Sequence, residues 1–252
     1  MGTLSDSARL AVGTLTTVRV PAPTVINRRV AGAAMTLGPL AALPLAVVAG
    51  LVIAGGQAVG LPELASAGLA LGAVALGSRG LHLDGLADTA DGLGASYDRV
   101  KALDVMRRGD SGPTGVATLL FVLLVQCGAL AGATAAGHGI AAVVVAVVAG
   151  RCVLSLCCAR GVPSARPDGL GATVAGSVPA VTAVAVFVLA AGLAALSPGL
   201  PWWRGALAVV LAYGVAGVLL IRCVRRLGGI TGDVLGGCVE VAVATALVTL
   251  AP

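Results

Sequence analysis

Long stretches without charged side chains limit how this chain can fold more than any other feature of its sequence. Residues 111–150 contain no Asp, Glu, Lys or Arg, and several other apolar stretches follow the same pattern. About 20 consecutive apolar residues are enough for a helix to cross the hydrocarbon core of a bilayer. Charged residues make up 11% of the 252-residue chain, whereas a soluble domain carries roughly 25%. A soluble monomer is therefore excluded.

The apolar stretches also decide the class of membrane protein. A transmembrane β-barrel needs short strands of alternating polarity and girdles of aromatic residues, but aromatic residues are only 2% of this chain. We therefore expect an all-α fold, a polytopic membrane helix bundle of about seven transmembrane spans, which forms a single integral-membrane domain over residues 1–252. The predicted spans are residues 32–53, 64–80, 113–136, 139–158, 176–196, 205–221 and 234–250.

The basic residues alternate between the two sides of this predicted bundle. Fourteen of the sixteen Lys and Arg residues lie in the N-terminal arm and in the loops after the second, fourth and sixth spans. The positive-inside rule places that side in the cytoplasm. Nine aspartates map to the same side. We therefore expect a protein of the cell membrane whose active-site loops face the cytoplasm.

The densest group of acidic side chains follows the second predicted span. Asp84, Asp88 and Asp91 are spaced i, i+4, i+7, so a helix would carry all three on one face. Their repulsion grows near the low-dielectric bilayer, and a divalent cation would relieve it. Oxygen ligands without His or Cys partners favour Mg²⁺ or Mn²⁺ over Zn²⁺. His82 is a candidate catalytic base, phosphate donor or packing residue. The alternative for the cluster is a solvated acidic loop paired with nearby arginines.

A glycine-rich turn comes directly before the last predicted span and contains Gly229, Thr231, Gly232 and Asp233. Thr231 is a candidate N-cap. A glycine-rich turn that begins a helix presents free N–H groups to a phosphate. Asp233 is then a candidate metal ligand or the base for an attacking hydroxyl. The alternative is an ordinary helix cap in a tight turn.

Two further basic loops, residues 106–115 and 160–171, lie on the same side of the bundle. The candidate phosphate-binding arginines are Arg79, Arg107, Arg108 and Arg166, and a further candidate metal ligand is Asp110. A carboxylate-rich, Mg²⁺-competent membrane site surrounded by arginines suits diphosphate chemistry. The metal neutralises the diphosphate, and arginine stabilises the charge that develops on the leaving phosphate.

Three segments resemble those of a known family. Residues 79–92, RGLHLDGLADTADG, resemble the signature of the cobalamin synthases, the adenosylcobinamide-GDP ribazoletransferase family (CobS type). Residues 228–236, GGITGDVLG, resemble its C-terminal signature. Residues 15–21, LTTVRVP, resemble its opening more weakly. The order and spacing of these motifs cover nearly the whole chain.

The resemblance implies a multi-pass membrane enzyme that acts late in cobalamin assembly. A ribose hydroxyl of α-ribazole, or of its 5′-phosphate, attacks the cobinamide-linked phosphate of adenosylcobinamide-GDP, and GMP leaves as adenosylcobalamin or its 5′-phosphate forms. The resemblance also implies Mg²⁺ as cofactor, association with other cobalamin-assembly enzymes and no nucleic-acid partner. One position departs from the family pattern. In ungapped register the family has Asp where this chain has Arg108, so either Asp110 substitutes for it or this ligand is lost.

Two other classes of protein compete with this interpretation. A CDP-alcohol phosphatidyltransferase uses the same Mg²⁺–Asp chemistry, but its pattern places Ala-Arg shortly after the first Asp-Gly. Here Leu-Ala-Asp follows Asp84-Gly85 instead. A cation-coupled transporter would favour acidic residues at the membrane midplane and inverted repeats, whereas these acids gather on one side. Release of GMP from adenosylcobinamide-GDP distinguishes the three classes.

Overall fold

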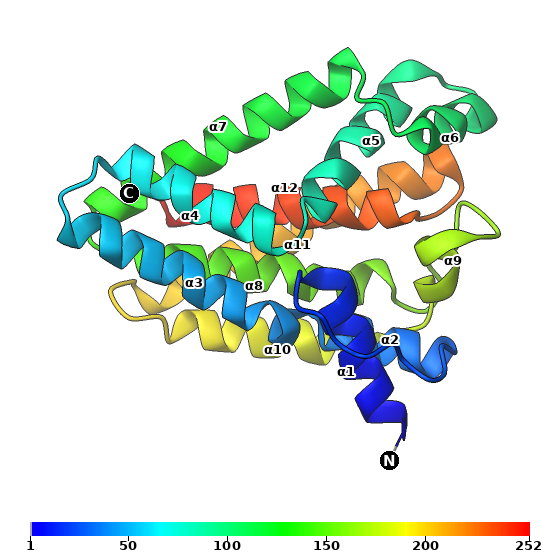
Figure 1. Ribbon diagram of the computed structural model, residues 1–252, viewed down its shortest axis with the longest axis horizontal. Coiled ribbons are helices and arrows are strands. Elements are labelled where there is room, and N and C mark those ends of the chain that lie inside the picture. Colours follow the sequence, from blue (N-terminus) through cyan, green and yellow to red (C-terminus); the bar gives the residue numbers. More distant parts are fainter. Residues whose placement is uncertain (1) are drawn as a thin grey trace.

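The computed structural model describes residues 2–252, and within this range the chain forms helices and no β-strand beyond two isolated bridges. The all-α prediction is therefore confirmed (Figure 1). The helices are α1 (Gly2–Leu15), α2 (Arg28–Thr36), α3 (Gly38–Ala58), α4 (Glu63–Gly77), α5 (Leu81–Ala95), α6 (Arg99–Arg108), α7 (Pro113–Ala135), α8 (Gly139–Cys157), α9 (Gly169–Val174), α10 (Ala180–Ala195), α11 (Trp202–Leu227) and α12 (Gly232–Leu250).

Six of the predicted spans each correspond to one apolar helix, whereas the first, residues 32–53, covers parts of both α2 and α3. Five are long and apolar enough to cross a bilayer by themselves: α2 with α3 as one unit, α7, α8, α11 and α12. The shorter α4 and α10 complete a set of about seven. Helix α10 begins at Ala180, later than predicted, because the chain at Val178 first pairs with Ala159 as an isolated bridge. The chain is a multi-pass membrane protein.

The outward faces of these helices are apolar, as lipid contact requires. Phe121 on α7 is 69% exposed, and Val181 on α10 is 82% exposed. Soluble proteins rarely present large continuous patches of this kind to water. The exposed side chains therefore support a position in the bilayer independently of the hydropathy pattern.

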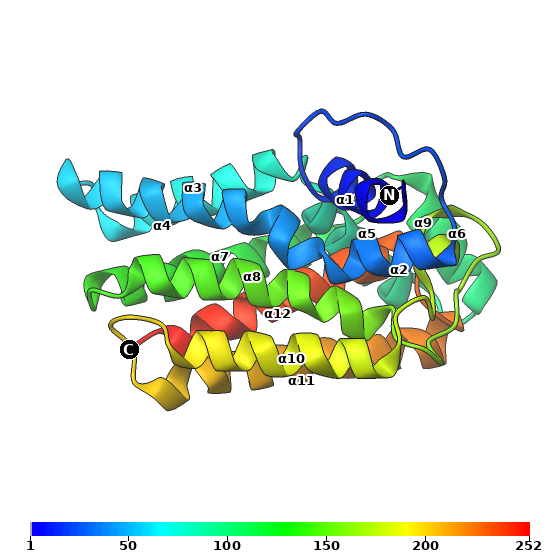
Figure 2. The same ribbon diagram turned by 90° about the horizontal axis from the view of Figure 1, so that it is seen from below.

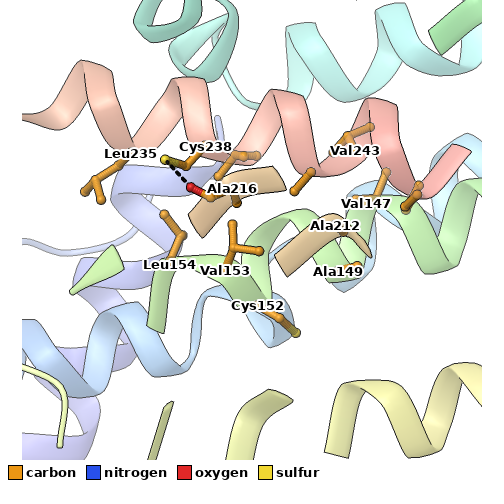
Figure 3. Close-up of a cluster of buried hydrophobic side chains, with 14 of the residues drawn as sticks. Val147, Ala149, Cys152, Val153, Leu154, Ala212, Ala216, Leu235, Cys238 and Val243 are labelled. Atoms are coloured by element: carbon orange, nitrogen blue, oxygen red, sulfur yellow. Dashed lines mark hydrogen bonds between the residues drawn. The ribbon is translucent and has the colours of Figure 1, made fainter. Parts of the chain in front are cut away.

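The spans pack in three layers. Figure 2 shows α3 with α4, then α7, α8 and α12, and finally α10 with α11. Small side chains let the middle and last layers approach closely. Figure 3 shows Val153 and Leu154 of α8, Ala216 of α11, and Leu235 and Cys238 of α12 gathered in one buried cluster. All six cysteines are free thiols, and five of them are buried.

A sharp bend separates α4 from α5. Arg79 and Gly80 both have left-handed backbone conformations, with φ of 57° and 66°. Two such residues in succession end one helix and redirect the next, and the axes of α4 and α5 differ by 89°. The two helices therefore do not form one straight span. Helix α5, which carries the acidic cluster, turns away from α4 at the end of the bundle.

The short helices gather at this same end. Figure 1 shows α5, α6 and α9 at one end of the bundle, with the C-terminus at the opposite end. Helix α1 and the loop before α9 also contribute to this end, because the cavity described below is lined from both. The loops and short helices of the predicted cytoplasmic side thus lie together at one end of the bundle.

Candidate active site

A cavity of about 260 Å³ opens at this end of the bundle, between α5, α12, α9 and the first two helices. Its wall includes six of the residues predicted from the sequence, which are His82, Asp84, Arg166, Thr231, Gly232 and Asp233. The two signature segments, which are far apart in the sequence, therefore line one cavity.

Two glycines bring these segments together. A Cβ atom added at Gly85 of α5 would lie 2.7 Å from the backbone oxygen of Asp233, and one at Gly236 of α12 would lie 3.0 Å from the backbone oxygen of His82. Real Cβ atoms essentially never show a contact as short as that at Gly85, and the contact at Gly236 is at the limit, so glycine at these positions lets the two helices cross closely. The start of α12 therefore packs beside α5, the helix that carries the acidic cluster.

Negative charge is concentrated at this crossing. Asp88 is 8% exposed. Burial, followed by the charges of Asp84, Asp233 and Asp91, raises the pKa of Asp88 to about 6, while Arg166 acts in the opposite direction. Asp88 thus lies close to three other carboxylates, whereas Arg166 is the one cation that acts on it. A bound cation would relieve their repulsion.

Asp91 has a local structural task. Its two carboxylate oxygens accept hydrogen bonds from the backbone N–H groups of Gly112, at 2.7 Å, and Gly115, at 2.8 Å. Both donors belong to the N-terminal end of α7, where backbone N–H groups lack helical partners. Asp91 therefore holds the start of α7 against α5. Each of its carboxylate oxygens already accepts one backbone hydrogen bond, which leaves less capacity for binding a metal ion.

The carboxylates of this region could hold a metal ion only together with ligands from outside the protein. Within residues 2–252, no three His, Cys, Asp or Glu side chains converge closely enough to hold a metal ion by themselves. Mg²⁺ is commonly bound by one or two carboxylates together with substrate phosphates and water. Asp84 and Asp233 line one cavity, and Asp88 lies in their field. These oxygens suit a hard cation that a diphosphate helps to coordinate.

Thr231 and Arg166 set the position of Asp233. Thr231 is the N-cap of α12, as predicted, and its hydroxyl accepts from the N–H of Val234 at 3.2 Å. The same hydroxyl donates to Asp233 Oδ2 at 3.1 Å. Arg166 lies 4.0 Å from that oxygen and donates to the backbone oxygen of Leu103 at 2.7 Å. Arg166 is thus the predicted arginine that the structure brings into the cavity.

The other predicted arginines do not line the cavity. Arg79 donates to the backbone oxygens of Gly13 and Thr14 at the end of α1, at 2.8 and 3.2 Å. Arg107 pairs with Asp168 at 3.1 Å on the surface. The remaining one, Arg108, pairs with Asp104 one turn away on α6, at 2.6 Å.

Asp110 and Gly229 also lie elsewhere. Asp110 is exposed in the loop before α7 and is absent from the charges that act on Asp88. Gly229 packs against the backbone of residues 163–165, where an added Cβ would collide with the backbone oxygen of Pro163. Glycine is needed at position 229 because the two loops are in direct backbone contact there. The N–H of Ile230 donates to the backbone oxygen of Pro163 at 2.9 Å.

Part of the cavity wall was not predicted from the sequence. Thr14 of α1 and Met35 of α2 also line the cavity, and Gly171 of α9 packs directly on Thr231. Glycine at 171 is a signal of close packing, because an added Cβ would lie 2.8 Å from Thr231 Cα. The contributions of α1 and α2 depend on tertiary packing alone.

The chain is similar to a described family over nearly all of its length. The family model described as "Cobalamin-5-phosphate synthase" matches residues 7–251. Proteins named adenosylcobinamide-GDP ribazoletransferase are similar in sequence. The one from Nocardioides sp. is 46% identical over 248 residues, which is 98% of this chain and 99% of the relative. That from Frankia casuarinae is 39% identical, covering 97% and 94%. That from Pseudomonas aeruginosa PAO1 is 35% identical, covering 87% of each. No solved structure matches.

Proposed function

This chain belongs to the cobalamin-5-phosphate synthase family, and we propose on that premise that it is an adenosylcobinamide-GDP ribazoletransferase. It transfers the adenosylcobinamide phosphate of adenosylcobinamide-GDP to α-ribazole or α-ribazole 5′-phosphate. The observation that carries this proposal is the α5–α12 crossing, which places Asp84 and Asp233 in one cavity. A membrane enzyme of diphosphate chemistry needs such a set of carboxylates beside a cation.

The reaction exchanges one bond to phosphorus for another. A ribose hydroxyl of the acceptor forms a new bond to the cobinamide-linked phosphorus, and the bond from that phosphorus to the oxygen of GMP breaks. GMP leaves with the bridging oxygen, and the hydroxyl proton passes to a base. Asp233 would serve as that base; its carboxylate accepts a hydrogen bond from Thr231 and lies 4.0 Å from Arg166.

The other residues around the cavity would bind the phosphates and the metal ion. Arg166 offers a guanidinium to the phosphate oxygens, and the start of α12 offers backbone N–H groups at Gly232. Asp84 and Asp88 would hold Mg²⁺ together with the substrate phosphates, and the bound ion would neutralise the diphosphate and favour departure of GMP. Reacting atoms must approach to about 3–3.5 Å, so the α5–α12 crossing determines whether these groups act on one substrate.

An assay of GMP release tests the proposal. Purified protein in lipid vesicles is incubated with adenosylcobinamide-GDP, α-ribazole and Mg²⁺. We expect release of GMP that depends on both organic substrates and falls about 1000-fold on chelation of the metal, since a catalytic metal contributes several kcal/mol. Release that persists in the presence of a chelator would contradict the metal assignment. Failure to release GMP under any condition would contradict the activity.

We also propose that the cavity faces the cytoplasm, because its end of the bundle carries nearly all of the basic residues. Seven spans and a cytoplasmic N-terminal arm place the C-terminus outside. A reporter that is active only in the cytoplasm should therefore be active when fused to the N-terminus and silent at the C-terminus. Activity at both ends would mean an even number of spans and would contradict this topology.

A further inference from the structure

A second cavity lies between α2 and the start of α10. Its volume is about 560 Å³, and it shares no lining residue with the active-site cavity. Three arginines line this arginine pocket: Arg28 and Arg29 of α2, and Arg160 of the loop after α8. None of the lining residues, all of which belong to the described range 2–252, is acidic. The arginine pocket therefore gathers positive charge without a carboxylate to balance it.

One of the three guanidiniums is used by the protein itself, and the other two are available to a ligand. Arg28 donates to the backbone oxygen of Gly176 at 2.7 Å, which ties α2 to the loop before α10. Arg29 and Arg160 are exposed and form no ion pair within residues 2–252. An anion in the pocket would relieve the repulsion between these charges. Guanidinium groups bind phosphate oxygens through pairs of hydrogen bonds, so a phosphate fits the pocket best.

The arginine pocket lies at the depth of the lipid headgroups. Its wall includes Leu37 and Pro179, which directly precede the apolar helices α3 and α10. Both helices run from there towards the opposite end of the bundle (Figure 2). Leu40 of α3 and Val181 of α10 are exposed just beyond the pocket, so the lipid-facing surface begins at its edge. Basic pockets between membrane helices at this depth bind the headgroups of anionic lipids.

An apolar groove lies between the same two helices, further along the bundle. Helices α3 and α10 both pack on α8 and have little contact with each other, so α8 forms the floor between them (Figure 2). A cavity of about 190 Å³ in this groove is lined by apolar side chains that include Leu43 of α3, Val144 and Val148 of α8, and Leu193 of α10. At 1.5 Å per residue, Leu43 lies about 9 Å along the helix from Leu37. One leaflet of a bilayer contains roughly 15 Å of hydrocarbon, so an acyl chain that starts at the arginine pocket can reach this cavity.

We propose that the arginine pocket binds the headgroup phosphate of an anionic phospholipid, and that one acyl chain of this lipid lies on α8 between α3 and α10. The phosphate supplies the anion that Arg29 and Arg160 lack within the protein. A soluble phosphate ester would match the charge of the pocket, but it would not use the apolar groove. The position of the pocket at the ends of two spans favours the lipid. This site is separate from the active-site cavity and does not depend on the reaction proposed for it.

Native mass spectrometry of the full chain tests the headgroup assignment. The protein in detergent is titrated with phosphatidylglycerol or with zwitterionic phosphatidylcholine, and the lipid molecules that stay bound are counted. We expect one phosphatidylglycerol to bind more tightly than phosphatidylcholine. Arg29→Gln with Arg160→Gln should weaken its binding about 30-fold, because each arginine near an anionic lipid contributes a factor of about five. Arg28 is left unchanged because it holds the backbone of Gly176.

Arg222→Gln with Arg225→Gln is the matched control. Both arginines are exposed near the C-terminal end of α11 and lie outside the arginine pocket. The control removes the same amount of charge, and binding of phosphatidylglycerol should change by less than about twofold, since exposed charges at a distance are screened. Equal weakening in the two double variants would indicate diffuse surface charge and would overturn the proposal. Equal binding of the two lipids by the unmodified chain would also overturn it. If the double variant does not fold, the single variants Arg29→Gln and Arg160→Gln should each weaken binding about fivefold.

Two further measurements distinguish a lipid from a soluble phosphate ester. Glycerol phosphate at millimolar concentration should leave phosphatidylglycerol bound, and displacement would assign the pocket to a soluble anion and overturn the proposal. Val148→Phe enlarges a side chain on the floor of the groove and should weaken binding about threefold, because the acyl chain loses its contacts there. Val184→Phe adds the same bulk to an exposed position of α10 outside both cavities and should have no effect. Equal binding by these two variants would overturn the placement of the acyl chain.

Discussion

Asp88→Asn is expected to lower the rate of GMP release about 1000-fold while the melting temperature of the protein stays the same or rises. The loss follows because an amide oxygen replaces a charged ligand beside the metal-bound diphosphate. The gain in stability follows from the electrostatics. The pKa of Asp88 is raised to about 6, above its ordinary value, so ionised Asp88 destabilises the fold at pH 7. A neutral side chain of the same shape removes that repulsion.

Asp104→Asn is the matched control for this prediction. Asp104 lies on α6 at the same end of the bundle and pairs with Arg108 in an ion pair in which both side chains are more than half exposed. Exposed pairs contribute little to stability, so this variant should retain full activity. A variant of Asp88 that loses both activity and melting temperature would indicate a structural role. Full activity would remove Asp88 from the metal site.

Much of the fold follows from the sequence because the bilayer imposes simple rules. A charge-free stretch of sufficient length must cross the membrane, and short loops carry the basic residues on one side. The bend between α4 and α5 was harder to predict. It depends on left-handed conformations at Arg79 and Gly80, and a non-glycine residue adopts that conformation only where the surrounding structure requires it.

The acidic and glycine-rich motifs meet in one cavity, but the arginines were difficult to assign from the sequence. At this end of the bundle several guanidiniums hold backbone oxygens of neighbouring loops and helices in place. The pairs are Arg28 with Gly176, Arg79 with Gly13, Arg99 with Ala165, Arg166 with Leu103 and Arg226 with Ser96. A sequence cannot distinguish an arginine that binds a carbonyl from one that binds a phosphate, because the carbonyl is supplied by tertiary contact.

The glycine crossing of α5 and α12 makes the strongest structural prediction. Gly85→Ala should reduce turnover about 100-fold, because a displacement near 1 Å of reacting groups can cost that much. The added methyl group would meet the backbone oxygen of Asp233 at 2.7 Å. Backbone cannot move aside as a flexible side chain does, so the start of α12 must shift away from α5. That shift separates Asp233 from Asp84, although neither carboxylate is altered.

A series of alanine substitutions makes this prediction quantitative. At Gly236 the added Cβ would lie 3.0 Å from the backbone oxygen of His82, a milder overlap, and at Gly72 on α4 it would meet nothing within 4 Å. Turnover should therefore fall most for Gly85→Ala, less for Gly236→Ala and not at all for Gly72→Ala. The last variant should even be slightly more stable, because alanine favours a helix over glycine by about 1 kcal/mol. Equal turnover in all three variants would show that the approach of α5 to α12 does not set the geometry of the reaction. Such a result would return the glycine-rich turn to the role of an ordinary helix cap.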